Sequence, residues 1–277
     1  MNINQKISIS IFLIIFLLTL ASSGIFAFGI LGVFAQNNDS SKTVPRTVLV
    51  ELFIQEGCSS CPTTEFCLED LAWEYGTSKF ILVQEHLWGD GYDTLETNAR
   101  YNWYVGDGKK GTPDVFIDGL TKRFQGLFCD CVEENYECYK DAIDKELSRP
   151  SLLELSTVTT RQSNPIPQGE REEEKVTKII IEGMAKNTSD TPLKDLAVCG
   201  MVAKERDEPG LYKYIQDIFP FQNMPPLLPG TTFSFKYVHE MPLIPESEID
   251  DEKEILHLVI FVQNTISKEI LQALYIE

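Results

Sequence analysis

The sequence predicts an α/β domain with a mixed central sheet over residues 46–149, followed by an all-β, immunoglobulin-like sandwich over residues 150–277. Three observations support this division. Apolar runs of strand length alternate with helical patterns up to about Leu147. Arg149-Pro150 then interrupts the chain, and only strand-like runs separated by turn-rich stretches follow. A length of 277 residues also suits two domains of moderate size.

The first half contains seven expected elements in the order β-α-β-α-β-β-α. Its first run is mostly apolar, as expected for a strand that is covered on both faces. The next run has an apolar stripe at helical spacing. A strand, a helix and a strand in succession imply parallel pairing with a helical crossover. The expected strands are Thr47–Ile54, Lys79–Gln84, Asp114–Asp118 and Arg123–Gln125, and the expected helices are Cys61–Tyr75, Thr94–Val105 and Glu133–Leu147.

The second half contains about six strand-like runs and no helical pattern. Proline-rich turns separate them, including Asn164-Pro165-Ile166-Pro167 and residues 225–230. Short strands at this spacing are typical of an antiparallel sandwich. The expected strands are Leu152–Thr160, Val176–Ala185, Asp195–Lys204, Thr232–Glu240, Ile255–Gln263 and Ile270–Ile276.

The start of the chain has the pattern of an export signal. Lys6 precedes an uncharged apolar run, Ile7–Ala35, which is long enough to span a bilayer. Val33-Phe34-Ala35 fits a cleavage site with small residues. We expect residues 1–35 to be a cleaved signal peptide or a retained membrane anchor and residues 36–45 to be a linker. The remainder then lies outside the cytoplasm, secreted or anchored to the membrane.

The net charge of the chain is −18, which repels phosphate backbones and argues against nucleic acid as a partner. The chain has seven cysteines, and export favours disulfides among them.

The most informative motif is Cys58-Ser59-Ser60-Cys61-Pro62. It follows a predicted strand and opens a predicted helix, where free backbone N–H groups favour a thiolate. Two intervening residues let the cysteines close a small disulfide. We expect Cys58 to attack a target disulfide and the more buried Cys61 to resolve the mixed disulfide. Pro62 suits the first helical turn because it lacks an N–H group.

About fifty residues later, Gly111-Thr112-Pro113 precedes the predicted strand at Asp114. Together with the stretch Val50-Glu51-Leu52-Phe53 and Gly57-Cys58-Ser59-Ser60-Cys61-Pro62, this segment resembles the thioredoxin-fold superfamily, and secreted thioredoxin-like domains in particular. The resemblance covers about Arg46 to Leu147 and implies a thioredoxin-like first domain. It also implies that Pro113 is a cis proline packed against the cysteine pair, and that Thr112 offers backbone hydrogen bonds to a bound peptide.

Two further residues are possible auxiliaries. The family places a buried acid on the first strand six positions before the first cysteine, whereas Glu51 lies seven before Cys58. Glu51 is therefore offset by one residue from the position at which the resemblance implies a proton acceptor for Cys61. His86 ends the second parallel strand, whose C-terminal end shares a sheet edge with the cysteine motif. It is a candidate for proton transfer or for stabilising a thiolate, or else a packed histidine.

Four other cysteines form a second group. Cys67 lies in the first predicted helix, Cys129 and Cys131 precede the last one, and Cys138 lies within it. Two structural disulfides among them are the favoured interpretation, with three possible connectivities. A second dithiol that exchanges electrons with Cys58–Cys61 is an alternative. A zinc or copper site made by Cys58, Cys61, Cys129 and Cys131 is another, but export disfavours free thiols, so we predict no metal. Cys199 is expected to be a buried, inert thiol.

Two functions of different classes fit these observations. The first is an extracytoplasmic thiol–disulfide oxidoreductase that needs no cofactor, acts on protein thiols or disulfides and exchanges electrons with an unidentified redox partner. The second is a non-catalytic secreted or surface binding module in which disulfides only stabilise the scaffold. A fold does not decide between them.

Overall fold

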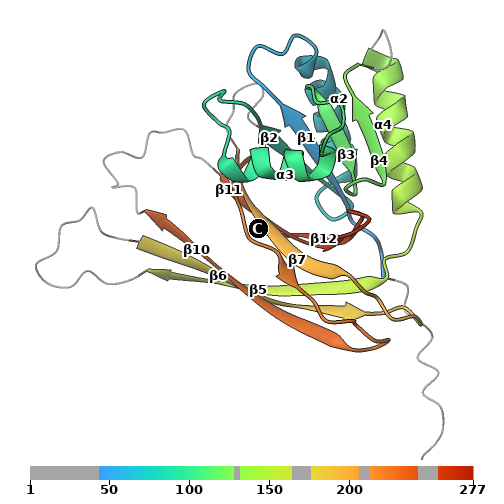
Figure 1. Ribbon diagram of the computed structural model, residues 1–277, viewed down its shortest axis with the longest axis vertical. Coiled ribbons are helices and arrows are strands. Elements are labelled where there is room, and N and C mark those ends of the chain that lie inside the picture. Colours follow the sequence, from blue (N-terminus) through green and yellow to red (C-terminus); the bar gives the residue numbers. More distant parts are fainter. Residues whose placement is uncertain (1–43, 128–131, 164–175, 206–211, 243–254, 277) are drawn as a thin grey trace, which may run out of the picture. The chain divides into compact units, whose positions relative to one another are not determined.

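The computed structural model describes residues 44–127, 132–163, 176–205, 212–242 and 255–276. The expected leader and most of the linker lie outside these ranges. The described residues form three helices and twelve strands, so the fold is mainly β (Figure 1). Within them, no helix has both the length and the apolar character needed to cross a membrane.

The first half has the predicted order of elements. Strand β1 pairs in parallel with β2 and antiparallel with β3, and β3 pairs antiparallel with β4, so the predicted mixed sheet is confirmed. Helices α2 and α4 lie against each other, and α3 crosses the fold separately (Figure 1). The elements are β1 (Val48–Ile54), α2 (Cys61–Tyr75), β2 (Phe80–His86), α3 (Leu95–Val105), β3 (Asp114–Ile117), β4 (Lys122–Gln125) and α4 (Val132–Leu147).

The second half consists of strands, as predicted. All six expected strands are present, together with two short strands that were not predicted, β8 and β9. The strands are β5 (Leu153–Ser163), β6 (Val176–Asn187), β7 (Leu196–Glu205), β8 (Tyr214–Ile218), β9 (Gln222–Asn223), β10 (Thr232–Pro242), β11 (Ile255–Asn264) and β12 (Ile270–Ile276).

One sheet takes strands from both halves of the chain. Its order is β12-β11-β7-β8-β2-β1-β3-β4, with β9 paired to β7. The junction is a short parallel pairing in which Gln84 of β2 lies opposite Tyr214 of β8. The unpredicted strand β8 is therefore the element that makes the sheet continuous.

The second sheet has three strands in the order β10-β6-β5. One hydrophobic core contains side chains of both sheets, such as Ile181 and Phe235 from the smaller sheet and Val198 and Ile260 from the larger one. Gly183 is needed here because a Cβ at this position would lie 2.3 Å from the Phe235 ring. The ring thus fills the space that a side chain on β6 would occupy.

The central strand β1 is buried along its whole length and separates two different environments. Val50, Leu52 and Ile54 belong to a core shared with α2 and α4. Leu49 and Phe53, on the other face, pack in cores that include β7 and β11 residues or α3 aromatic rings. Alternation along a strand places successive side chains on opposite faces, so Glu51 shares the face of Leu49 and Phe53.

Candidate functional site

The cysteine pair forms a disulfide between the end of β1 and the start of α2. Cys58 and Cys61 are bonded, with their Cα atoms 5.5 Å apart. The Cys58 N–H group donates to Gln55 O at 3.1 Å, and the Cys61 N–H group donates to Cys58 O at 3.3 Å, so the loop is folded on itself. Cys58 is half-buried, whereas Cys61 is only 3% exposed. The more accessible sulfur is therefore that of Cys58.

The start of α2 favours negative charge at this position. Cys61 is the first helical residue, Pro62 follows it, and no acidic side chain lies in the first turn. The flanking Ser60 makes no side-chain capping hydrogen bond. The first N–H groups of the helix thus keep their positive potential for a nearby thiolate once the disulfide is reduced.

The Thr112–Pro113 segment lies at the same end of β1. The peptide bond between these residues is cis. Asp114 begins β3 and lies opposite Phe53 of the antiparallel strand β1, so Pro113 is placed near the point where the cysteine loop leaves the sheet. Pro113 is buried and Thr112 is half-buried. Both predicted residues are thus positioned at the edge that carries the disulfide.

His86 is also at this edge and is connected to the cysteine loop. It lies opposite Ile54 in the parallel pair β1–β2. Its Nδ1 atom is 2.6 Å from Oδ2 of Asp90, and the same oxygen accepts a hydrogen bond from the backbone N–H of Glu56 at 3.2 Å. Asp90 therefore holds the imidazole and the loop before Cys58 in one network.

Glu51, the other predicted auxiliary, lies on the face of β1 away from Cys61. Arg100 donates to both carboxylate oxygens, through Nε to Oε1 and through Nη2 to Oε2, the latter at 3.0 Å. The hydroxyl of Tyr104 donates to Oε2 at 2.6 Å. Cys61 instead belongs to the core on the α2 face. The structure does not bring Glu51 and Cys61 together, and the carboxylate is held as part of a buried ion pair.

Arg100 was not among the residues predicted from the sequence, although a signal existed. A carboxylate in an otherwise apolar, fully buried strand requires a buried cation. A neighbouring acid completes the cluster: Glu85 is completely buried, and its Oε1 atom is 3.8 Å from Arg100 Nε. Burial, reinforced by the charge of Glu51, raises the pKa of Glu85 well above its ordinary value.

Arg46, near the beginning of the described chain, forms a second buried ion pair and also binds the backbone of β12 near its end. Arg46 Nε donates to Asp118 Oδ2 at 2.8 Å, and Arg46 Nη2 donates to the carbonyl of Ile270 at 2.6 Å. Asp118 also accepts the N–H of Leu49 at 2.9 Å. Burial outweighs these contacts and raises the pKa of Asp118 to about 6. This cluster stabilises the fold and contains none of the predicted site residues.

The remaining cysteines differ from the expectation of structural disulfides. Cys67 and Cys138 carry free thiols, so neither forms an expected disulfide. Cys129 and Cys131 lie outside the described residues. Burial raises the pKa of Cys67 to about 11, and its thiol donates to Val132 O at 3.5 Å. Cys199 is buried, as predicted, with a pKa raised to about 12 by burial.

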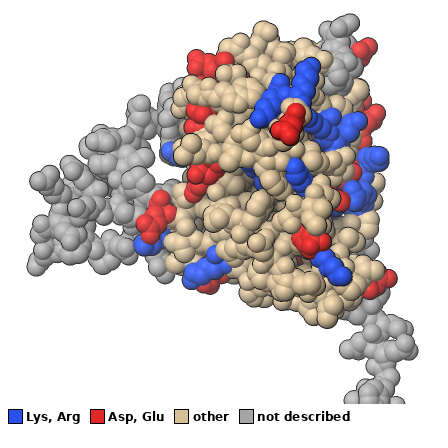
Figure 2. All heavy atoms as spheres, viewed as in Figure 1, with Lys and Arg blue, Asp and Glu red and all other residues tan. Residues whose placement is uncertain are grey.

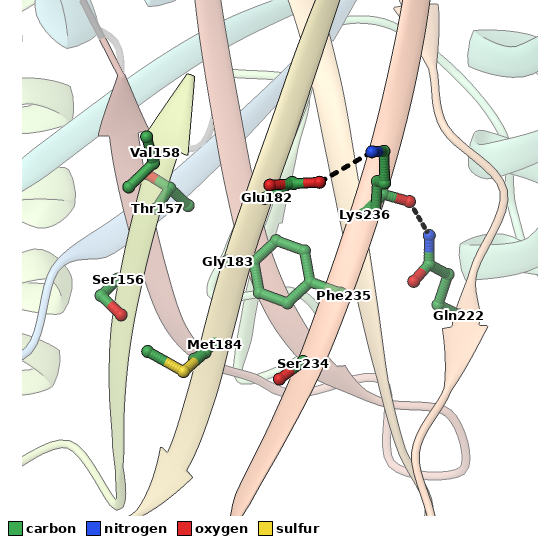
Figure 3. Close-up of a pocket in the computed structure, with 10 residues that line it drawn as sticks. All are labelled: Ser156, Thr157, Val158, Glu182, Gly183, Met184, Gln222, Ser234, Phe235 and Lys236. Atoms are coloured by element: carbon green, nitrogen blue, oxygen red, sulfur yellow. Dashed lines mark hydrogen bonds and ion pairs between the residues drawn. The ribbon is translucent and has the colours of Figure 1, made fainter. Parts of the chain in front are cut away.

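A groove of about 710 Å³ crosses the three-stranded sheet (Figure 3). Two neighbouring rows of side chains border it: Ser156, Met184 and Ser234 in one row, and Val158, Glu182 and Lys236 in the next. Lys236 pairs with Glu182 at 2.7 Å. The groove contains no predicted site residue. Figure 2 shows acidic and basic side chains interspersed among larger uncharged areas on the face viewed.

The chain is similar in structure to a known protein over most of its length. Neither a protein-family model nor a curated protein matches the chain. HBP35 of Porphyromonas gingivalis is similar in structure, with a TM-score of 0.56 and 19% identity over 84% of this chain and 75% of that one. At this identity the likeness concerns the fold alone.

Two glycosidase structures overlap this chain in part. The Bacteroides uniformis β-glucuronidase 2 bound to cyclophellitol-6-carboxylate aziridine has a TM-score of 0.30 and 14% identity over 42% of this chain and 12% of that one. The Kluyveromyces marxianus β-glucosidase in complex with glucose has a TM-score of 0.21 and 16% identity over 50% of this chain and 16% of that one. These scores support no argument about fold or function.

These findings correct the family resemblance inferred from the sequence. No family model recognises the chain, and its likeness is to HBP35 at low identity. The described residues are mainly strands with three helices, in a sheet that also includes strands of the second half. The assignment to the thioredoxin-fold superfamily was therefore wrong. The role of the cysteine site has to be inferred from its geometry and not from a family.

Proposed function

We propose that the protein is a thiol–disulfide oxidoreductase that acts on protein thiols or disulfides through Cys58 and Cys61. One observation supports this above the others. The disulfide lies at the start of α2, and its two cysteines differ in exposure, with Cys58 half-buried and Cys61 buried. Attack by an accessible thiolate and resolution by a protected thiol require this asymmetry.

The reaction can be written in two steps for the reduced protein. The Cys58 thiolate attacks one sulfur of a target disulfide, the target S–S bond breaks, and a mixed disulfide forms with release of one target thiol. Cys61 then loses its proton and attacks Cys58 Sγ, which reforms the Cys58–Cys61 bond and releases the second target thiol. Two electrons pass to the target. In the opposite direction the same steps oxidise a target dithiol, and a redox partner restores the starting state.

Thr112 and Pro113 are proposed to align the target chain at this edge of the sheet. Their position beside the end of β1 supports this role. His86, held by Asp90 next to the cysteine loop, is proposed as an auxiliary in proton transfer. No nucleic acid, metal or cofactor takes part in the proposed reaction.

The finer organisation of the chain belongs to the same proposal. Residues 46–149 would act as the redox unit, and residues 150–277 as an immunoglobulin-like sandwich that positions it or binds a partner. Residues 1–35 would export the protein as a signal peptide or membrane anchor, so that the reaction takes place outside the cytoplasm. The core that the three-stranded sheet shares with β7 and β11 of the larger sheet supports the sandwich assignment.

An insulin-reduction assay with dithiothreitol tests the function. Wild-type protein should accelerate insulin precipitation. Cys58→Ser should abolish the acceleration, and Cys61→Ser should accumulate a mixed disulfide with insulin that mass spectrometry detects. Cys138→Ser, which removes a thiol outside the pair, is the matched control and should behave as wild type. Equal activity of the wild type and both pair variants would contradict the proposal and favour the non-catalytic binding module.

A further inference from the structure

The resolving step needs a group that accepts the Cys61 proton, and the structure removes Glu51 from that role. Its carboxylate is bonded to Arg100 and Tyr104 on the far face of β1. An acceptor must instead lie on the α2 side of the sheet, near the first turn of that helix.

Glu65 satisfies this requirement through its position on α2. It follows Cys61 by four residues, so the two side chains are neighbours on one face of the helix, with Cβ atoms roughly 5–6 Å apart. Side chains in a helix lean toward its N-terminus, which directs the Glu65 carboxylate toward Cys61. Glu65 is half-buried, and no described residue gives it a hydrogen bond or ion pair.

Glu69, one turn further along α2, shows what this face of the helix contacts. Its Oε1 atom accepts a hydrogen bond from Gln84 Nε2 on β2 at 3.3 Å. Because α2 runs antiparallel to β2 in a strand–helix–strand crossover, one turn back along the helix corresponds to about two residues forward along the strand. Glu65 is therefore placed at the level of His86, between Gln84 and the cysteine loop.

The protonation of Glu65 suits proton exchange near neutral pH. Burial, assisted by the charge of Glu69, raises the pKa of Glu65 from an ordinary value of 4.5 to about 7. General acid–base groups work best when their pKa lies near the working pH. The other titratable groups at this level of the fold are Glu69 on the helix, and His86, Asp90, Tyr92 and Tyr214 around the end of β2.

We propose that Glu65 is the proton acceptor of Cys61 in the resolving step, an inference that rests on the proposed oxidoreductase function. The Glu65 carboxylate takes the proton from Cys61 Sγ, and the resulting thiolate attacks Cys58 Sγ of the mixed disulfide. The bond between Cys58 and the target sulfur breaks as the Cys58–Cys61 bond forms. Glu65 then passes the proton to the departing target thiolate, which restores the carboxylate and releases the target as a thiol.

The test follows both steps separately, with oxidised glutathione as the target of the fully reduced protein. Samples are quenched in acid and analysed by intact-mass spectrometry, which resolves the glutathione adduct from the dithiol and disulfide forms. Glu65→Gln should form the adduct at the wild-type rate but resolve it more slowly, by about a hundredfold or more, at pH 7. The wild-type resolving rate should rise through pH 7 as Glu65 ionises, and Glu65→Gln should lack this rise.

Three variants make the result decisive. Glu69→Gln removes the neighbouring carboxylate and should keep an inflection in the resolving rate, moved to lower pH because the charge of Glu69 no longer raises the pKa of Glu65. Glu65→Asp keeps a carboxylate and should recover part of the rate. Cys61→Ser should trap the adduct, and no adduct in this variant would instead refute the oxidoreductase function. If the adduct forms and Glu65→Gln resolves it with the wild-type rate and pH profile, Glu65 is not the acceptor.

Discussion

The two faces of β1 differ in what they do with polar groups. The face toward α2 is lined by Val50, Leu52 and Ile54 and leads to the cysteine loop. The opposite face carries the buried Glu51–Arg100 pair, with Tyr104 bonded to both partners. An acidic residue close to a cysteine motif in sequence can therefore belong to the scaffold, because alternation along one strand separates their side chains by the thickness of the sheet.

Removing the cation of the buried Glu51–Arg100 pair is expected to have the largest effect. Arg100→Met keeps an apolar stem near the rings of Tyr104 and Phe261, which lie 4.8 and 4.9 Å from the guanidinium. It leaves Glu51 without its buried partner, which should lower the free energy of unfolding by about 3–5 kcal/mol. Urea denaturation followed by circular dichroism measures this loss.

Arg149→Met is the matched control for this prediction. The Arg149 side chain is 44% exposed and pairs with Glu146 and Glu269. Loss of such a pair should cost less than about 1 kcal/mol, because water already screens it. The folded fraction of Arg100→Met should still exchange disulfides at the wild-type rate. An equal loss of stability in the two variants would show that the buried Glu51–Arg100 pair contributes no more than an exposed one.

The second effect is a dependence of stability on pH that originates from Glu85. Its pKa is raised above 4.5 by burial and by the charge of Glu51, so the folded protein keeps a proton that the unfolded chain has lost. The free energy of unfolding should therefore fall as pH rises above 4.5, by about 1.4 kcal/mol per pH unit until the folded group ionises. Glu85→Gln cannot ionise and should lose this slope.

Urea titrations at several pH values between 4.5 and 8 measure this effect as the difference between variant and wild type. The gain in stability of Glu85→Gln over wild type should grow with pH. Glu154→Gln removes an exposed glutamate of β5 and reports the background change in surface charge. A difference that does not vary with pH would mean that Glu85 is ionised in the folded protein throughout this range.

The sequence predicted the order of elements well because periodicity reports which residues are buried. It placed Cys58 and Cys61 at the start of a helix and Thr112-Pro113 before a strand, and the structure has both. It did not predict the junction at Gln84 and Tyr214, because β8 is only five residues long, too short for a periodic pattern to be distinctive.

The sequence also could not identify the ionic partner of Glu51. Arg100 is distant in the chain, and a charged residue on a predicted helix is ordinarily assigned to solvent. The likeness to a known family misled for a related reason. A few residues around one motif carry local geometry, whereas the strands of the second half that complete the sheet lie more than a hundred residues away.

The smallest effect should come from Cys67, a cysteine outside the reacting pair that lies on the α2 side of β1. Cys67 is completely buried in the same core as Cys61, and burial raises its pKa to about 11, so it remains a thiol at neutral pH. Cys67→Ala removes one sulfur and its contact with Val132 O, which should lower the free energy of unfolding by about 1 kcal/mol. The rate of disulfide exchange should not change, because a buried thiol that stays protonated is a poor nucleophile. Exposure would then distinguish the cysteines on the α2 side of β1: the half-buried Cys58 reacts with the target, whereas the completely buried Cys67 only contributes to the core. A large loss of exchange in Cys67→Ala would instead show that electrons pass through this core.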